Sequence, residues 1–165
     1  MSHSQISIFK LELAKEAQIT RKMLERIPAD KLSWQPHPKS MTVGALAAHI
    51  AELPEWIKFA VTTDGLDFAA TPYEAKVFTD PREIIESFEE SLETGLDALE
   101  VADEDQLDKA WTLRAGEQVL DQNTKAGVIR MTLSQGVHHR AQLGVFLRLL
   151  DVPIPGSYGP SADEH

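Results

Sequence analysis

Cysteine is absent from the 165-residue chain, which excludes disulfides, thiol nucleophiles and cysteine-ligated metal sites. A chain without disulfides is typical of the cytoplasm, and we expect that location. No apolar run approaches the roughly 20 residues that a membrane-spanning helix needs, so we expect no membrane partner. The first residues, MSHSQISIFKLELAKEAQ, also lack the basic segment and apolar block of a secretory signal.

Positive charge is scarce as well. The 16 Lys and Arg residues face 26 Asp and Glu residues, giving a formal net charge of -10. Such a chain repels phosphate backbones, and its basic residues are scattered, so we expect no nucleic-acid partner. A glycine-rich phosphate loop and a nucleophile elbow are both missing. The Glu-x-x-His pairs of di-iron carboxylate bundles are missing too.

Hydrophobic residues make up 42% of the chain, enough for one folded domain. We predict a single domain over residues 1–165, with its core at about 3–150 and an extended tail at 151–165. The tail DVPIPGSYGPSADEH is rich in turn-forming residues. The first helix is predicted to end before Pro28. Its apolar face is predicted to hold Ile8, Leu11, Ile19, Met23 and Ile27.

Capping residues and prolines mark the other helices. Thr42 is a predicted N-cap, and Pro54 predicts a kink in the helix that follows. Asp80 and Pro81 start the third helix, and Asn123 or Thr124 starts the last. Two short extended pieces are predicted around Gly116. With the long connection TDGLDFAATPYEAKVFT, these signals predict an all-α four-helix bundle with one long crossover.

The last helix is apolar on two sides, although a bundle core needs one. The first stripe holds Val128, Met131, Thr132, Gln135, His139, Gln142 and Phe146. The second holds Ile129, Leu133, Val137 and Leu147, with Gly136 and Gly144. The surplus side predicts a homodimer through this helix, unless the long loop or the tail covers it.

Histidines are the candidate site residues. His49 lies in the apolar segment GALAAHIAEL, and Gln135 and His139 lie four residues apart on one face of the last helix. Imidazole is a common ligand of divalent metals, so these three side chains form a candidate metal site. Core histidines satisfied by hydrogen bonds fit the same pattern. His138 is expected to turn aside, and Glu52 to be a ligand, an acceptor behind His49 or a solvated residue.

Several stretches resemble the DinB/YfiT-like four-helix bundles. They are TVGALAAHIAELPEW, SQGVHHRAQLGVFLRLL, the tail DVPIPGSYGPSADE and the loop KLSWQPHPKSMTVG. The resemblance implies a homodimer and a divalent metal, nickel or zinc before iron or manganese, held by three histidines. One of these matches His49. The other two follow a pattern like His-x-x-x-His-Arg-Gly-Gln, in which the second is His139 and the first is replaced by Gln135.

The amide at Gln135 should weaken metal binding relative to an imidazole. The resemblance implies a metal-dependent enzyme of the thiol S-transferase, isomerase or hydrolase type, acting with an external thiol or with water. The alternative is a metal-free, non-catalytic dimer that binds a small ligand or a protein. The sequence assigns no catalytic residue and no organic cofactor.

Other polar and aromatic residues have structural interpretations. Arg140 and Arg148 are expected to pair with glutamates of the third helix, or otherwise to line an anion pocket or the dimer seam. Tyr158 is expected to pack, or to close over the pocket. The tryptophans are expected in the core or in a pocket wall, and they are Trp34, Trp56 and Trp111.

Overall fold

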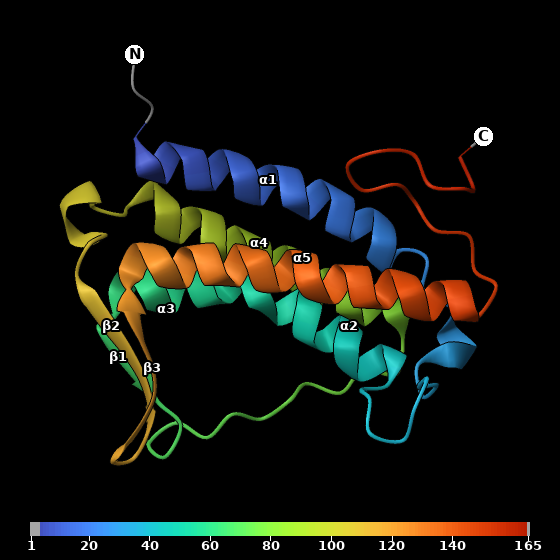
Figure 1. Ribbon diagram of the computed structural model, residues 1–165, viewed down its shortest axis with the longest axis horizontal. Coiled ribbons are helices and arrows are strands. Elements are labelled where there is room, and N and C mark those ends of the chain that lie inside the picture. Colours follow the sequence, from blue (N-terminus) through green and yellow to red (C-terminus); the bar gives the residue numbers. More distant parts are fainter. Residues whose placement is uncertain (1–3, 165) are drawn as a thin grey trace.

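The computed structural model describes residues 4–164 (Figure 1). Its five α-helices are α1 (Gln5–Leu24), α2 (Val43–Glu52), α3 (Trp56–Thr62), α4 (Pro81–Glu100) and α5 (Lys125–Leu149). Short 3₁₀ turns are η1 (Ala29–Lys31), η2 (Leu53–Glu55) and η3 (Glu104–Gln106). The strands are β1 (Gly65–Asp67), β2 (Ala110–Ala115) and β3 (Gln118–Thr124).

The helices form one bundle in which α2 and α3 together make up one arm (Figure 1). The segment after β1 runs along the outside of the bundle to the start of α4, so that α4 runs in the same direction as α2 and α3. This is the predicted crossover. No helix within residues 4–164 combines the length and apolar character that a membrane span requires.

Local signals start and break the helices where the sequence predicts. Thr42 accepts a hydrogen bond from the Ala45 amide at 3.1 Å, and Thr124 caps α5 in the same way. Asp80 forms a capping box with Glu83 at the start of α4. Pro54 lies in η2, the turn that divides α2 from α3, which confirms the predicted break.

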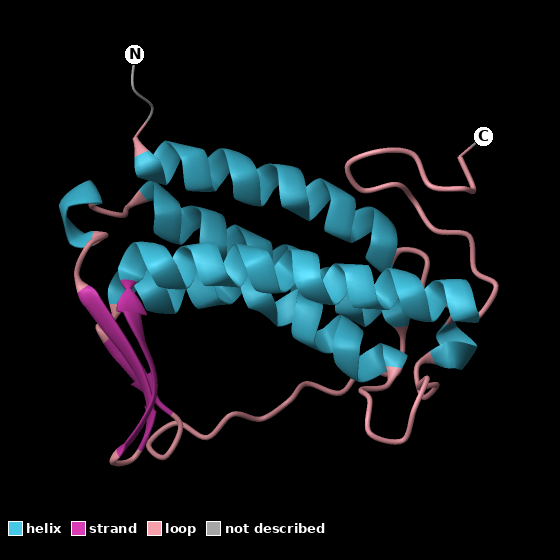
Figure 2. Ribbon diagram, in the orientation of Figure 1, coloured by secondary structure: helices cyan, strands magenta, loops and turns pink. Residues whose placement is uncertain are grey.

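A three-stranded sheet, in the order β1-β2-β3, corrects the all-α prediction (Figure 2). The two extended pieces around Gly116 form an antiparallel hairpin, and Gly116 takes a φ of +61°, which favours glycine. β1 pairs with β2 in parallel. Trp111 of β2 is 1% exposed and donates from its indole nitrogen to the Phe59 carbonyl and the Thr63 hydroxyl, which fixes the sheet to α3.

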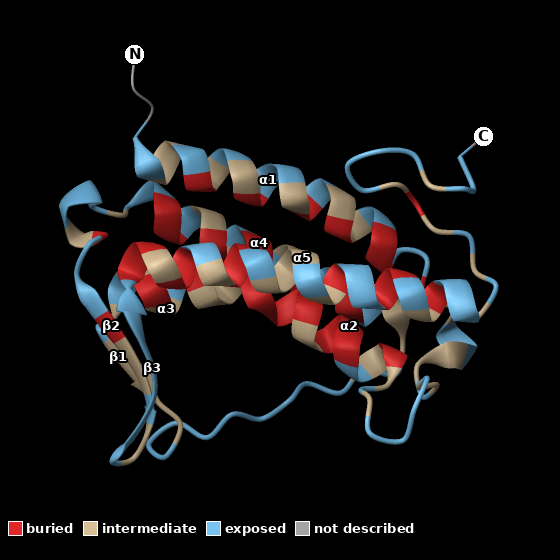
Figure 3. Cartoon of the chain, viewed as in Figure 1, coloured by how far each residue is buried: buried red, intermediate tan, exposed pale blue. Residues whose placement is uncertain are grey.

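Burial on α1 differs from the predicted stripe. Ile8 and Leu11 are 50% and 66% exposed, while Phe9 and Leu13 are buried. Figure 3 shows buried and exposed positions alternating along α1. The helix is rotated because its small and polar positions, Ala17 and Thr20, also face the core, where apolar counting does not register them.

Both stripes of α5 are used within the chain. Ile129, Leu133 and Leu147 belong to the buried core, and α5 contacts α1, α2 and α3. Gly144 lies against the Met23 side chain and Ile154 of the tail. Part of the surplus side is therefore covered by α1 and the tail, and the large apolar residues that α5 leaves exposed are Val145 and Leu149.

The backbone of α4 packs closely against the turn at Pro54. A Cβ added at Gly95 would lie 2.6 Å from the Pro54 carbonyl oxygen, whereas one added at Gly136 of α5 would meet nothing within 4 Å. We expect Gly95→Ala to lower the free energy of unfolding by about 1–3 kcal/mol, because backbone must shift. Gly136→Ala should be neutral or add about 0.5–1 kcal/mol. Urea denaturation measures both, and equal stabilities for the two variants would contradict the packing described.

Candidate metal centre

The candidate centre lies where α2 passes α5. His49 of α2 and His139 of α5 meet edge to face, with ring centroids 4.6 Å apart and planes at 78°. Gln135 lies one turn before His139, and its amide oxygen is 2.8 Å from His139 Nε2. The three predicted side chains are thus brought to one place, although His49 and His139 are 90 residues apart in the sequence.

His49 is oriented by a carboxylate. Its Nδ1 lies 2.8 Å from Glu52 Oε1, and Glu52 is only 9% exposed, so it is no solvated surface residue. The Tyr73 hydroxyl, from the connection before α4, donates to the same oxygen at 2.5 Å. Burial and the bond to Glu52 raise the pKa of Tyr73 to about 12, which keeps the phenol a donor. A carboxylate beside Nδ1 favours the tautomer of His49 that is protonated at Nδ1, which leaves the free lone pair on Nε2.

His139 is held from both sides by glutamines. Its Nδ1 is 2.9 Å from Gln142 Oε1, and its Nε2 faces Gln135. Burial is the main cause that lowers the pKa of His139, with His49 and His138 adding repulsion, while the bond to Gln142 opposes the shift. A neutral imidazole donates through one nitrogen only, so one glutamine presents its NH₂ group to the ring. If Nδ1–H donates to Gln142 Oε1, the lone pair is on Nε2 and Gln135 must turn its NH₂ group toward it; if Nε2–H donates to Gln135 Oε1, the lone pair is on Nδ1.

These donors fit a weak divalent site. In both histidines Nδ1 contacts a side-chain oxygen, which is the arrangement that orients metal-ligating imidazoles. Gln135 adds a neutral amide oxygen. No group of three His, Asp or Glu side chains with metal-binding potential occurs within residues 4–164. The candidate ligands are therefore two imidazoles and one amide. A strong site has at least three imidazole or charged ligands, so this one has one strong ligand too few.

The neighbouring residues have defined places. His138 is exposed and turns aside, with its ring 4.8 Å from that of His139. Tyr73 and Gln142 were not predicted as hydrogen-bond partners. The spacing of Gln142, three residues after His139 on one helix face, is a signal for its contact. Tyr73 comes from an irregular connection and carries no such signal.

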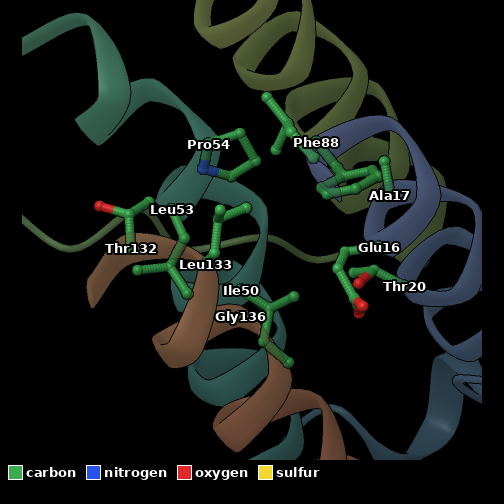
Figure 4. A pocket seen from close by; sticks show the side chains of 11 residues that line it. Glu16, Ala17, Thr20, Ile50, Leu53, Pro54, Phe88, Thr132, Leu133 and Gly136 are labelled. Atoms are coloured by element: carbon green, nitrogen blue, oxygen red, sulfur yellow. The ribbon is translucent and has the colours of Figure 1, made fainter. Parts of the chain in front are cut away.

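A small cavity of about 30 Å³ lies inside the bundle, between α1, the α2–η2 segment, α4 and α5 (Figure 4). Its walls are mostly apolar, and Glu16, Thr20 and Thr132 supply the polar atoms. Ile50 and Gly136, which directly follow His49 and Gln135 in the sequence, line it, so the cavity lies on the core side of the centre.

Arg140 pairs with α1. This corrects the expected pairing with glutamates of the predicted third helix, which is α4. The side chain is 1% exposed, and its Nη1 donates to Glu16 Oε2 at 2.7 Å and to the Thr20 hydroxyl at 3.1 Å. Its Nη2 donates to the Tyr158 hydroxyl, so Tyr158 ties the tail to α1 and α5. Arg148 also pairs with the tail, through Asp163. Within residues 4–164 neither arginine forms a salt bridge or hydrogen bond with α4, the helix predicted as the third.

The chain is a helical bundle with a small three-stranded sheet, and two histidines converge between its helices. The chain belongs to the DinB family, which it matches over residues 1–165. It is 27% identical over 150 residues to the uncharacterized protein YrdA of Bacillus subtilis, covering 90% of this chain and 85% of YrdA.

Solved structures show the same fold. A DinB-like protein from Bacillus cereus superposes with a TM-score of 0.69 at 20% identity, covering 91% of this chain and 95% of that one. A DinB-like protein from Bacillus subtilis gives a TM-score of 0.70 at 19% identity, with 91% and 96% covered.

Proposed function

We propose that His49, His139 and Gln135 hold a divalent metal, and that the protein is a metal-dependent enzyme of the thiol S-transferase, isomerase or hydrolase type. The observation that supports this most is the pair of imidazoles in contact at 4.6 Å, each with Nδ1 occupied by a side-chain oxygen. Nickel or zinc suits imidazole donors best, ahead of iron or manganese. When bound, the metal supplies Lewis acidity that lowers the pKa of a coordinated thiol or water.

The residues around the centre support an open site rather than a closed structural one. Glu52 and Gln142 fix the two rings, and Gln135 is the weak donor, the one most readily exchanged for an external ligand. The chain has no cysteine, so a thiol substrate comes from outside. An external thiolate would restore the third strong donor that Gln135 does not provide.

A metal-free, small-ligand-binding or interaction module is the second candidate. The contact between Gln135 and His139 Nε2 favours it, because the amide satisfies the ring nitrogen that a metal would otherwise take. In this case the centre is a hydrogen-bonded structural cluster.

A metal titration separates the two functions. We expect the untagged protein to bind one Zn²⁺ or Ni²⁺ per chain, and His49→Ala to lose at least about tenfold in affinity, because one of two imidazoles is removed. Competition with a chromophoric chelator measures the affinity. His37→Ala, at an exposed loop histidine, is the matched control and should bind as the parent does. Equal affinities for both variants would leave the metal-free module as the function.

We also propose a homodimer through α5. Val145 and Leu149, 59% and 60% exposed, are the apolar side chains of this helix that a partner copy would cover.

A further inference from the structure

A second hollow lies beside the metal centre, on the other side of Glu52. It has a volume of about 210 Å³ and lies between α3 and the connection that follows β1. Glu52 belongs to both places, since it holds His49 and also lines this pocket. Figure 3 shows the connection mostly exposed, so the pocket lies near the surface.

Aromatic rings form much of the pocket wall. Trp56 of α3 is central, with its ring centroid 6.1 Å from that of Phe59 and 6.4 Å from that of Phe68. The planes cross at 76° and 72°, so the rings stand as perpendicular walls. Tyr73 closes a further side, fixed through its hydroxyl to Glu52. Perpendicular rings around a hollow present π-faces from more than one direction.

The charge at this pocket has one sign. Three carboxylates line it, from Glu52, Glu55 and Glu74. Within residues 4–164 none of the three forms a salt bridge with a lysine or arginine, and the only ion-pair partner is His49, at Glu52. The pocket is therefore electronegative in a chain whose net charge is already -10.

We propose that this pocket binds a small organic cation that carries a methylated ammonium group. Aromatic faces attract a cation through the ring quadrupole, and carboxylates add charge attraction. The apolar methyl groups suit walls made by Trp56, Phe68 and Leu66. Anions are repelled. The inference goes beyond the proposed metal centre, and binding needs no metal, although the shared Glu52 would place the ligand next to that centre.

Two probes of one shape test the charge requirement. Choline and its neutral carbon isostere 3,3-dimethylbutan-1-ol are titrated into chelator-treated full-length protein, and binding is followed by NMR chemical shifts. We expect choline to bind at least about tenfold more tightly than the isostere, because only the cation gains from the rings and the carboxylates. Equal binding of both probes, or no binding of choline, would overturn the proposal.

Matched variants place the binding in this pocket. Glu55→Gln should weaken choline binding about three- to tenfold, while Glu93→Gln, at an exposed position on α4, should not change it. Trp56→Phe should weaken binding about threefold or more, because tryptophan has the stronger π-face, and Trp34→Phe should have no effect. The Glu→Gln changes keep side-chain shape, the Trp→Phe changes keep one aromatic ring, and circular dichroism checks that each variant is folded. Equal effects within either pair would show that choline binds elsewhere and would overturn the assignment.

The Zn²⁺ titration described above is run on the same samples. Zn²⁺ binding without choline binding would overturn this inference and leave the proposed metal site. Choline binding without Zn²⁺ binding would support this inference and overturn the metal site.

Discussion

Gln135→His is expected to tighten the binding of Zn²⁺ or Ni²⁺ by at least about 10- to 100-fold. The substitution turns a donor set of two imidazoles and an amide into three imidazoles on the same two helices. Imidazole is the better ligand for these metals, and a direct ligand should matter at least as much as the outer contacts that change affinity by about 10- to 100-fold. Competition with a chelator of known affinity measures the gain.

Ser134→His is the matched control for this gain. Ser134 is exposed on the same turn of α5, one residue before Gln135, so its side chain points about 100° away. We expect this variant to bind metal as the parent does. A gain of equal size in both variants would mean that any added surface histidine recruits metal, and the geometry assigned to His49 and His139 would then be wrong.

Arg140→Met is expected to lower the free energy of unfolding by about 3–5 kcal/mol. The arginine is 1% exposed and bridges Glu16, Thr20 and Tyr158, so its removal leaves a largely buried carboxylate without its cation. The contact between α1 and α5 should weaken, and the tail should lose its link at Tyr158. Urea denaturation gives the free energy, and protease digestion reports release of the tail.

Arg148→Met provides the comparison on the same helix. Its side chain is 46% exposed and pairs with Asp163, and an exposed ion pair of this kind contributes about 1 kcal/mol or less. We therefore expect a loss several-fold smaller than at Arg140. Losses of the same size at both positions would contradict a structural role for the buried pair.

Helix boundaries could be predicted because they depend on short-range chemistry. Thr42, Asp80 and Thr124 satisfy the free amides of a first turn, and Pro54 cannot continue an α-helix, wherever the chain lies in the fold. The hairpin around Gly116 follows from similarly local signals. Its parallel partner β1 could not be predicted, because three residues give no pattern and the pairing spans residues 65 to 114.

Side-chain faces were harder to predict than boundaries. On α1 we predicted that Ile8 and Leu11 face the core. All the helices that pack against α1 decide which side is buried, and the buried side includes Ala17 and Thr20. The second stripe of α5 was taken as a surplus face for the same reason. Ile129, Leu133 and Leu147 lie in the core, where α5 contacts α1, α2 and α3, and no local pattern on α5 records how those helices pack around it.

The candidate site was more accessible to sequence reasoning than its surroundings. His139 and Gln135 share a helix face by spacing alone, His49 stands out as a histidine in an apolar helical segment, and the family resemblance supports it as the third position. The contact of Arg140 with Glu16 rather than with α4 is set by helix order in space, which sequence spacing does not encode. Tyr73 reaches Glu52 from a long connection, and only the folded chain shows that.

The two proposals meet at Glu52. Its Oε1 accepts from Tyr73 and contacts His49 Nδ1, so one carboxylate borders both the proposed metal site and the aromatic pocket. A ligand seated among Trp56, Phe59 and Phe68 would lie beside the face where the two histidines meet.

The most direct test of the metal centre is an anomalous difference map from crystals of the untagged protein soaked in Zn²⁺. The account predicts one strong peak at about 2.0–2.1 Å from Nε2 of both His49 and His139, with the Gln135 amide beside it. A peak at other residues only, or no peak at these two rings, would contradict it and leave the histidines as a hydrogen-bonded structural pair.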